Sequence, residues 1–152
     1  MAQLHKNLTL TLGLISVLIL ASCKVNGYRN GLRTGLWVTQ DDSGKLGFKS
    51  KGRYKKDIEK GFWKYKHGKD LYKKEKYNGT TSTVRFYHPN SKIAATGMTM
   101  VDFNGIELHW YYHGNWKYFD TQGKPFKVVT YKKGNLVAEV PSNKPTTTKP
   151  SN

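Results

Sequence analysis

The sequence is poor in cysteine, in acidic residues and in long apolar runs, and each shortage narrows the class of protein. Cys23 is the only cysteine among 152 residues, so no disulfide can form within the chain, and stability must come from packing and strand pairing. Ten Asp and Glu stand against 26 Lys and Arg, a formal net charge of +16. Such a surface attracts polyanions without choosing between nucleic acid, acidic polysaccharide and anionic lipid.

The longest apolar run, Leu8–Leu20, has 13 residues. As a helix it would span about 20 Å, which is too short for a bilayer core of about 30 Å but fits the apolar region of a secretory signal peptide. All 20 Phe, Trp and Tyr residues come after this segment. The aromatic content favours a folded core over disorder, despite the charge.

The signal-like segment ends in Leu20-Ala21-Ser22-Cys23. This tetrapeptide resembles the bacterial lipobox, and the resemblance implies a diacylglyceryl group on Cys23, cleavage before it and acylation of the new amine. Two or three acyl chains hold a protein at a membrane far more firmly than one. An ordinary signal peptide cut near Ala21-Ser22, which leaves Cys23 as a free thiol, is the alternative. Lipoproteins of diderm bacteria that stay in the inner membrane often carry Asp after the cysteine. Lys24 stands there, which favours the outer membrane in such a host.

Composition divides the chain into four parts. Residues 1–22 are predicted to be a signal peptide with a helical apolar segment, and residues 23–34 a polar, Gly-rich lipidated tether. The folded domain is predicted to cover residues 35–140. Residues 141–152 are rich in Pro, Thr and Lys without an apolar period, so a disordered tail is expected.

The folded part is predicted to be all-β. Short alternating runs are separated by Asn-Gly, His-Gly and Lys-Gly pairs, and no segment after residue 24 has a 3.6-residue apolar period. Asn104-Gly105 predicts a two-residue hairpin turn, and that turn would fix the register of its strands. The expected pairs are Phe103 with Ile106, Val101 with Leu108 and Thr99 with Trp110 on one face, and Asp102 with Glu107, Met100 with His109 and Met98 with Tyr111 on the other.

A unit recurs in which a lead residue is followed by a small residue and Lys at a turn. The lead residues are Trp37, Trp63, Val84 and Trp116, and glycine precedes the three Trp by two positions, at Gly35, Gly61 and Gly114. The matching turns are Gly44-Lys45, Gly68-Lys69, Ser91-Lys92 and Gly123-Lys124. Self-similarity at this spacing is typical of a repeat architecture.

From about residue 31 to 136 these units resemble the MORN-repeat variant of bacterial YwqK-type antitoxin proteins. The match is best at Gly61 and Gly114, and the sequence departs from the pattern at Thr39, where an aromatic is expected, and at Val84, which replaces Trp. The resemblance implies a ladder of β-hairpins in an extended sheet used for protein–protein contact. The family name carries an antitoxin or immunity role.

Residues 45–76 are the most basic part of the chain, with 12 Lys and Arg53 against four acids, and aromatic residues are interleaved among them. Lys beside stacking aromatics suits a polyanion groove. The preponderance of Lys over Arg argues against base readout, so nucleic acid is an unfavoured partner, and salt-sensitive contacts with acidic glycan or lipid headgroups are expected. The alternative is a solvated face that keeps strand edges from pairing. The candidate polyanion-binding residues are Lys55, Lys56, Lys60, Lys64, Lys66, Lys69, Lys73, Lys74 and Lys76.

No catalytic, metal or cofactor site is predicted. His109 and His113 would lie about 13 Å apart on a strand, too far to share one ion. Asp102 and Glu107 would face each other as an acid/base pair, but beside an exposed turn. Trp37, Trp63 and Trp116 are predicted to form the repeat core, with a sugar-stacking row as the alternative.

The sequence therefore predicts a non-enzymatic lipoprotein of the cell envelope. It would be held at a membrane through its lipid anchor and serve as a binding or scaffold module for a protein partner in the envelope. The main rival is a module that binds envelope polyanions, such as lipopolysaccharide phosphates or acidic glycan, through residues 45–76. An enzyme acting on surface glycans is a third and weaker hypothesis.

Overall fold

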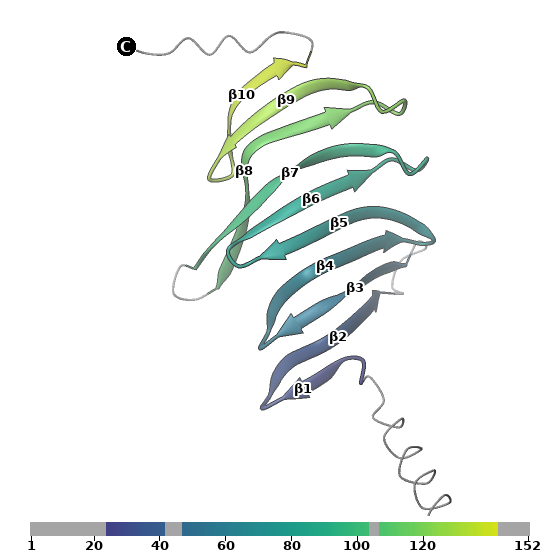
Figure 1. Ribbon diagram of the computed structural model, residues 1–152, viewed down its shortest axis with the longest axis vertical. Helices are drawn as coiled ribbons and strands as arrows, with labels where there is room; N and C mark the ends of the chain where they lie inside the picture. The colour runs from purple at the N-terminus through teal and green to yellow at the C-terminus, as the bar shows by residue number, and fades with distance from the viewer. Residues whose placement is uncertain (1–23, 42–46, 104–106, 143–152) are drawn as a thin grey trace, which may run out of the picture.

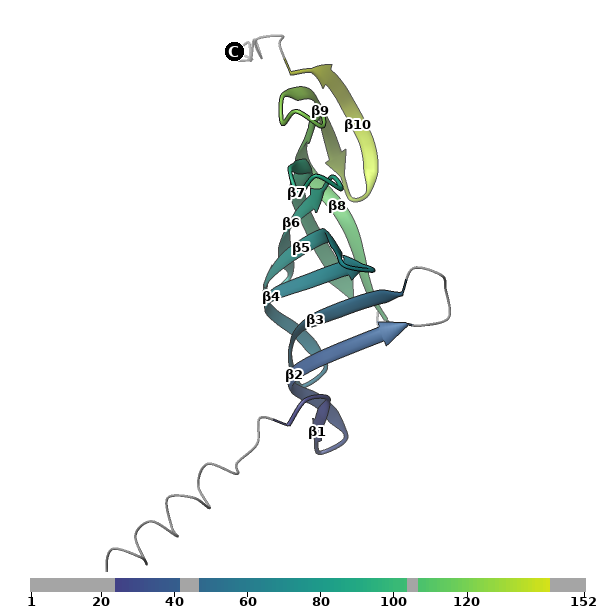
Figure 2. The ribbon, with the colours of Figure 1, turned by 90° about the vertical axis from the view of Figure 1, so that its right-hand side faces the viewer.

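The computed structural model describes residues 24–41, 47–103 and 107–142, and these form one open sheet of ten antiparallel strands. The strand order in the sheet is the order in the chain, so each strand pairs with the next (Figure 1). The sheet twists along its length (Figure 2). The predicted all-β class and the extended hairpin sheet are confirmed. The strands are β1 (Gly27–Arg29), β2 (Leu32–Asp41), β3 (Phe48–Lys55), β4 (Ile58–His67), β5 (Asp70–Asn78), β6 (Thr81–Tyr87), β7 (Ile93–Phe103), β8 (Leu108–Phe119), β9 (Pro125–Lys132) and β10 (Asn135–Pro141).

The sheet begins at Gly27, inside the segment that was expected to be a tether up to residue 34. Asn30-Gly31 closes the β1–β2 hairpin with a positive φ at both residues, 53° and 76°, which is the type I′ geometry of two-residue turns. Asn-Gly is the preferred pair for that turn, so the sequence carried the signal. Residues 1–23, with the predicted signal peptide and Cys23, and residues 143–152 of the predicted tail lie outside the described residues.

The repeated turns take the conformation that their residues favour. Three of the predicted closures, Gly68-Lys69, Ser91-Lys92 and Gly123-Lys124, lie at turns, and the first residue of each has a positive φ. The fourth, Gly44-Lys45, lies outside the described residues.

Register sorts the side chains onto two faces, because paired residues of antiparallel strands project to the same side. One face, here named the aromatic face, carries Trp37, Tyr54, Trp63, Tyr65, Tyr77, Val84 and Trp116. The indoles of Trp37, Trp63 and Trp116 are exposed by 9%, 3% and 0%. They are therefore part of the core, as predicted, and do not form a row open to sugars.

Two of the three Trp repeats, those led by Trp63 and Trp116, stack the indole on a glycine of the preceding strand. A Cβ at Gly97 would lie 2.2 Å from Cδ2 of Trp116, and one at Gly52 would lie 1.9 Å from Cδ2 of Trp63. The indole N–H of Trp116 then donates to the carbonyl of Met98, at 3.1 Å, just after that glycine. At both places the register shifts by a bulge. The repeated glycine two residues before the Trp has a positive φ that favours glycine, 62° at Gly61.

The third repeat lacks these features together. Val84 replaces Trp, Ser82 replaces the glycine before it, and the residue facing Val84 on β5 is Glu75 instead of glycine. The β5–β6 register has no bulge. Valine is small enough to pack against a side chain of the neighbouring strand, so it needs no facing glycine. The Trp, the facing glycine and the bulge therefore occur together as one packing unit.

The β7–β8 hairpin bends over the aromatic face. Trp110 on β8 contacts Tyr77 on β5, with ring centroids 5.3 Å apart. Three strand spacings in a flat sheet would separate these strands by about 14 Å. The sheet is therefore curled here, and this curl shields the aromatic side chains in a protein whose described part contains a single sheet.

The register of this hairpin differs from the prediction by two residues. Phe103 pairs with Leu108, and Val101 pairs with Trp110, so the loop is longer than two residues. Asn104-Gly105 itself lies outside the described residues. The docking of Trp116 on Gly97, at the far end of the hairpin, accounts for this register better than the turn does. A slip of two residues preserves the face of every side chain, so the predicted division between the two faces still holds.

Candidate functional site

The face opposite the aromatic residues is basic from β3 to β6, and we name this surface the cationic face. Its residues alternate along each strand with those of the aromatic face, as the sequence Lys60-Gly-Phe-Trp63-Lys64-Tyr-Lys66 illustrates for β4. The members are Lys49, Lys51, Arg53, Lys55, Lys60, Lys64, Lys66, Lys74, Lys76 and Arg85.

Register places these cations directly opposite one another. Lys51 pairs with Lys64, Lys64 with Lys74, and Lys74 with Arg85, which forms a row across four adjacent strands. Neighbouring strands lie about 4.8 Å apart, so the row is about 14 Å long. Further like-charge pairs flank it, Lys49 with Lys66 and Arg53 with Lys60. Directly opposed like charges destabilise a sheet by several tenths of a kcal/mol to about 1 kcal/mol each.

The acidic residues of β3–β6 and their turns do not neutralise this face. Glu59 accepts a hydrogen bond from Tyr54 on the aromatic face, and Glu75 accepts from Tyr77 there. Asp57 bonds to Arg33 at the β3–β4 turn, and Asp70 is the register partner of His67, on the side of the sheet that carries Tyr65. The ion pairs of the described residues, Arg33–Asp57, Lys73–Glu75 and Lys127–Glu139, include none of the ten cations.

Phe62 is the exposed aromatic residue of this face, which also carries the half-buried Tyr87, whose ring centre lies 5.4 Å from Lys74 Nζ. The Phe62 side chain is 69% exposed, and Lys76 Nζ lies 5.3 Å from the centre of its ring. Hollows lie on either side of it. One of about 420 Å³ is lined by Leu36, Lys51, Arg53, Lys60 and Lys64, and one of about 290 Å³ is lined by Lys74, Glu75, Lys76, Thr83 and Arg85. Phe62 belongs to both.

No family model matches this chain, and no curated protein or solved structure matches it. The lipobox and MORN-repeat resemblances therefore stay predictions, and the candidate site is defined by its own geometry.

The structure places six of the nine predicted lysines on the cationic face and three elsewhere. Lys73 lies on the aromatic face, where its Nζ is 3.1 Å from Glu75 and 3.9 Å from the centre of the Tyr65 ring. It alternates regularly with Lys74 along β5 and pairs with Tyr65, so period-2 alternation itself directs it to the aromatic face. Lys56 and Lys69 lie at turns on opposite ends of the hairpins.

Two features of the site were missed or misplaced from sequence. Arg85 completes the row from outside the basic block, and the signal was its position in the alternation of β6. The aromatic residues expected to interleave with the lysines lie mostly on the opposite face. Period-2 alternation separates the two kinds of side chain, and only the odd or even position of each residue could have shown this.

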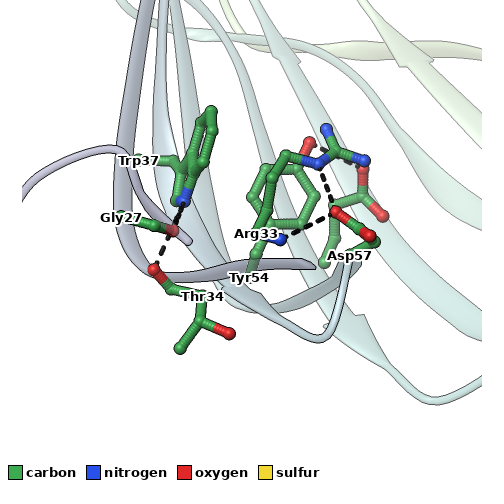
Figure 3. A network of polar contacts seen from close by, with 7 residues as sticks. Gly27, Arg33, Thr34, Trp37, Tyr54 and Asp57 are labelled. Carbon is green, nitrogen blue, oxygen red and sulfur yellow. Dashed lines mark hydrogen bonds and ion pairs between the residues drawn. The ribbon is translucent and has the colours of Figure 1, made fainter. Parts of the chain in front are cut away.

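A polar network on the aromatic face joins the first strands of the sheet (Figure 3). Arg33 Nε donates to Asp57 Oδ1 at 2.8 Å, and the Arg33 guanidinium lies 4.0 Å from the centre of the Tyr54 ring. The indole N–H of Trp37 is shared by the carbonyls of Gly27 and Thr34, each at 3.3 Å. These contacts join β1, β2 and the β3–β4 turn, so the strands that carry Lys51 and Lys60 are held in register.

Burial keeps the tyrosines of the aromatic face neutral. Desolvation, with the negative charge of Glu59 nearby, raises the pKa of Tyr54 to about 12. Desolvation and Glu75 likewise raise the pKa of Tyr65. Tyr65 and Tyr77 hydroxyls lie 3.2 Å apart, and Tyr77 donates to Glu75 at 2.8 Å. The aromatic face therefore consists of hydrogen-bonded, uncharged rings behind a charged outer surface.

The residues weighed for chemistry do not converge. Asp102 pairs with His109 rather than with Glu107, and it accepts a hydrogen bond from Tyr111 at 3.0 Å. His113 pairs with Met98. Among the described residues no group of three or more His, Cys, Asp or Glu side chains could hold a metal ion. Within the same ranges no helix has the length and apolar character needed to cross a bilayer.

Proposed function

We propose that this protein binds acidic polymers of the bacterial cell envelope through its cationic face and is held in the envelope by lipid on Cys23. The observation that supports the proposal is the unscreened row Lys51–Lys64–Lys74–Arg85, in which like charges oppose one another on four strands. A sheet that tolerates this repulsion gains stability when an anionic chain lies along the row.

The start of the sheet fits attachment near a membrane. Lys24, Val25 and Asn26 are the residues between Cys23 and β1, and they reach at most about 14 Å. Asn26 is already bonded to Val38 through its side chain. With a lipid on Cys23, edge strand β1 stays close to the bilayer, and β3 follows about 10 Å farther along the sheet.

The test replaces three lysines of the row, Lys51, Lys64 and Lys74, by glutamine. In K51Q/K64Q/K74Q, affinity for a carboxylated polysaccharide such as polygalacturonate should fall roughly tenfold to a hundredfold at low salt, from about 0.5–1 kcal/mol per exposed contact. The free energy of unfolding should rise by about 0.5–2 kcal/mol, because three like-charge pairs are relieved. A loss of binding together with a gain of stability is the signature of a ligand-binding surface.

The matched control is K69Q/K92Q/K124Q, which removes the same charge from the turns. It should leave binding within about threefold, since the row is intact. Equal losses in the two triple variants would show that net charge alone governs binding and would refute the proposed face. Neutral dextran should not bind either protein.

A protein partner is a second candidate, and strand β10 favours it. This edge strand is exposed along its length, and Leu136, Val137 and Val140 are 58%, 55% and 41% exposed. Unpaired strand edges with apolar side chains can accept another strand. A complex formed there would persist at salt concentrations that release a polyanion, so recovery in moderate salt distinguishes the two functions.

A further inference from the structure

Phe62 is an aromatic residue of the cationic face at a position where the repeat does not require an aromatic side chain. It occupies the middle position of Gly61-Phe62-Trp63, where the bulge directs Trp63 into the core and Phe62 outward. The equivalent middle positions of the other repeats hold Leu36, Thr83 and Asn115. Two of these are polar, so the repeat does not need an aromatic ring there. The side chain of Phe62 is 69% exposed, so its ring is accessible to a ligand that the surrounding cations attract.

The surroundings of Phe62 define the chemistry of that ligand. Its ring separates the two hollows, and cations line both, with Lys51 and Lys60 on one side and Lys74 and Arg85 on the other. Glu75 also lines the second hollow, but its carboxylate is bonded to Tyr77 and Lys73. A ligand that fills the site therefore carries acidic groups on both sides of an apolar ring face. A polysaccharide of acidic sugars has this pattern, because each sugar offers a C–H surface that packs on an aromatic ring and a carboxylate that reaches a cation.

Two other anionic partners fit the geometry less well. Single-stranded nucleic acid is bound by stacking successive bases on several exposed aromatic side chains. The described part of this face has one exposed ring, Phe62, and the Tyr87 ring beside Lys74 is half-buried. A bilayer is flat, whereas neighbouring strands rotate by roughly 20–25°, so a row across four strands turns by about 60–75°. A flexible chain can follow that turn.

We propose that Phe62 is a sugar-stacking platform between two acid-binding subsites, which makes the cationic face selective for acidic polysaccharide over other polyanions. This proposal rests on the proposed function, since the flanking subsites are the cationic face itself.

The experiment compares a polyanion that has sugar rings with one that has none. The full chain, purified in a non-ionic detergent, is titrated into fluorescently labelled oligogalacturonate and into labelled polyglutamate at the same salt concentration. Phe62→Ala should weaken binding of oligogalacturonate roughly threefold to tenfold, the range for one aromatic stacking contact. It should leave polyglutamate affinity within about twofold, since a peptide chain of carboxylates offers no sugar face to the ring.

The controls separate stacking from damage to the sheet. Phe62→Trp should bind oligogalacturonate at least as well as the unsubstituted chain. Phe103→Ala removes a ring of matched exposure, 68%, from the end of β7 and should change neither affinity. Because the Phe62 ring is largely exposed, Phe62→Ala should unfold at the same urea concentration as the unsubstituted chain.

Several outcomes would refute the proposal that Phe62 is a sugar-stacking platform. Equal losses for both polymers, or no loss for either, would mean that the ring does not recognise sugar. Tighter, Phe62-dependent binding of oligo(dT) or of vesicles containing anionic phospholipid would assign the face to nucleic acid or to a membrane instead. If the unsubstituted chain bound neither polymer, the proposed function itself would be wrong, whereas a platform failure alone leaves polyglutamate binding intact.

Discussion

Gly97→Ala should be among the most destabilising single-methyl additions in this protein. The new Cβ would lie 2.2–2.5 Å from three atoms of the Trp116 ring, whereas ordinary contacts begin near 3.4 Å. Trp116 is completely buried, and Tyr112 stacks on it with centroids 4.1 Å apart, so the ring has little room to move. Either the strands separate or the indole leaves its site.

The expected loss of unfolding free energy in Gly97→Ala can be bracketed by two known effects. Overpacking a core costs about 1–3 kcal/mol, and complete loss of a buried Trp costs about 3–5 kcal/mol. Alanine in an extended strand gains about 0.5–1 kcal/mol over glycine. The net loss should be about 2–4 kcal/mol, a large part of the roughly 5–15 kcal/mol that stabilises a typical domain.

Urea unfolding followed by far-UV circular dichroism measures this loss as a shift of the midpoint at constant slope. The matched control is Gly27→Ala in β1, where the nearest atom would lie at 3.7 Å, and its stability should change by less than about 1 kcal/mol. In a Trp116→Val background, which copies the Val84 repeat, Gly97→Ala should cost less than about 0.5 kcal/mol. An equal cost with and without the indole would refute the account of the repeat.

Two further predictions concern the turn at Asp57 and the anchor. The hydrogen bonds from Arg33 lower the pKa of Asp57, so this carboxylate stabilises the fold above its unfolded pKa of roughly 3.9, and that stability is lost as pH falls through the lower folded pKa. Asp57→Asn, which tolerates the positive φ, should flatten the dependence of unfolding free energy on pH below 4, and an unchanged slope would exclude this role. Native protein should exceed the mass of the cleaved polypeptide by the lipid on Cys23, and Cys23→Ser should be released from membranes. Detection of an unmodified Cys23 thiol in the native protein would refute the proposed lipid anchor.

Local patterns were sufficient to predict the sheet. Pairs such as His67-Gly68 and Gly134 after Lys133 favour turns, and alternation in segments such as Trp63-Lys64-Tyr65 predicts strands with two unlike faces. These signals depend on a few neighbouring residues, so they can be recognised in the sequence without knowledge of the tertiary contacts. Asn30-Gly31 carries the same kind of turn signal, but residues 23–34 were predicted to be a tether, so the first hairpin was missed.

Register and bulges depend on contacts between strands, and these were not predictable from local patterns. The β7–β8 pairing is consistent with the packing of Trp116 on Gly97, 19 positions away in sequence, rather than with the Asn104-Gly105 pair. The bulge in β5 between Leu71 and Lys73 likewise has no local signal. For the same reason the basic block alone could not show that Arg85 completes the row or that Phe62 is the exposed ring among the cations.

The most direct test of the account is to map the binding surface by nuclear magnetic resonance, with oligogalacturonate titrated into isotopically labelled protein at low salt. The account predicts that the largest shifts fall on Phe62 and on the side-chain ammonium groups of Lys51, Lys64 and Lys74, and that these shifts reverse as salt is added. Shifts concentrated along edge strand β10, or the absence of shifts on β3–β6, would contradict it.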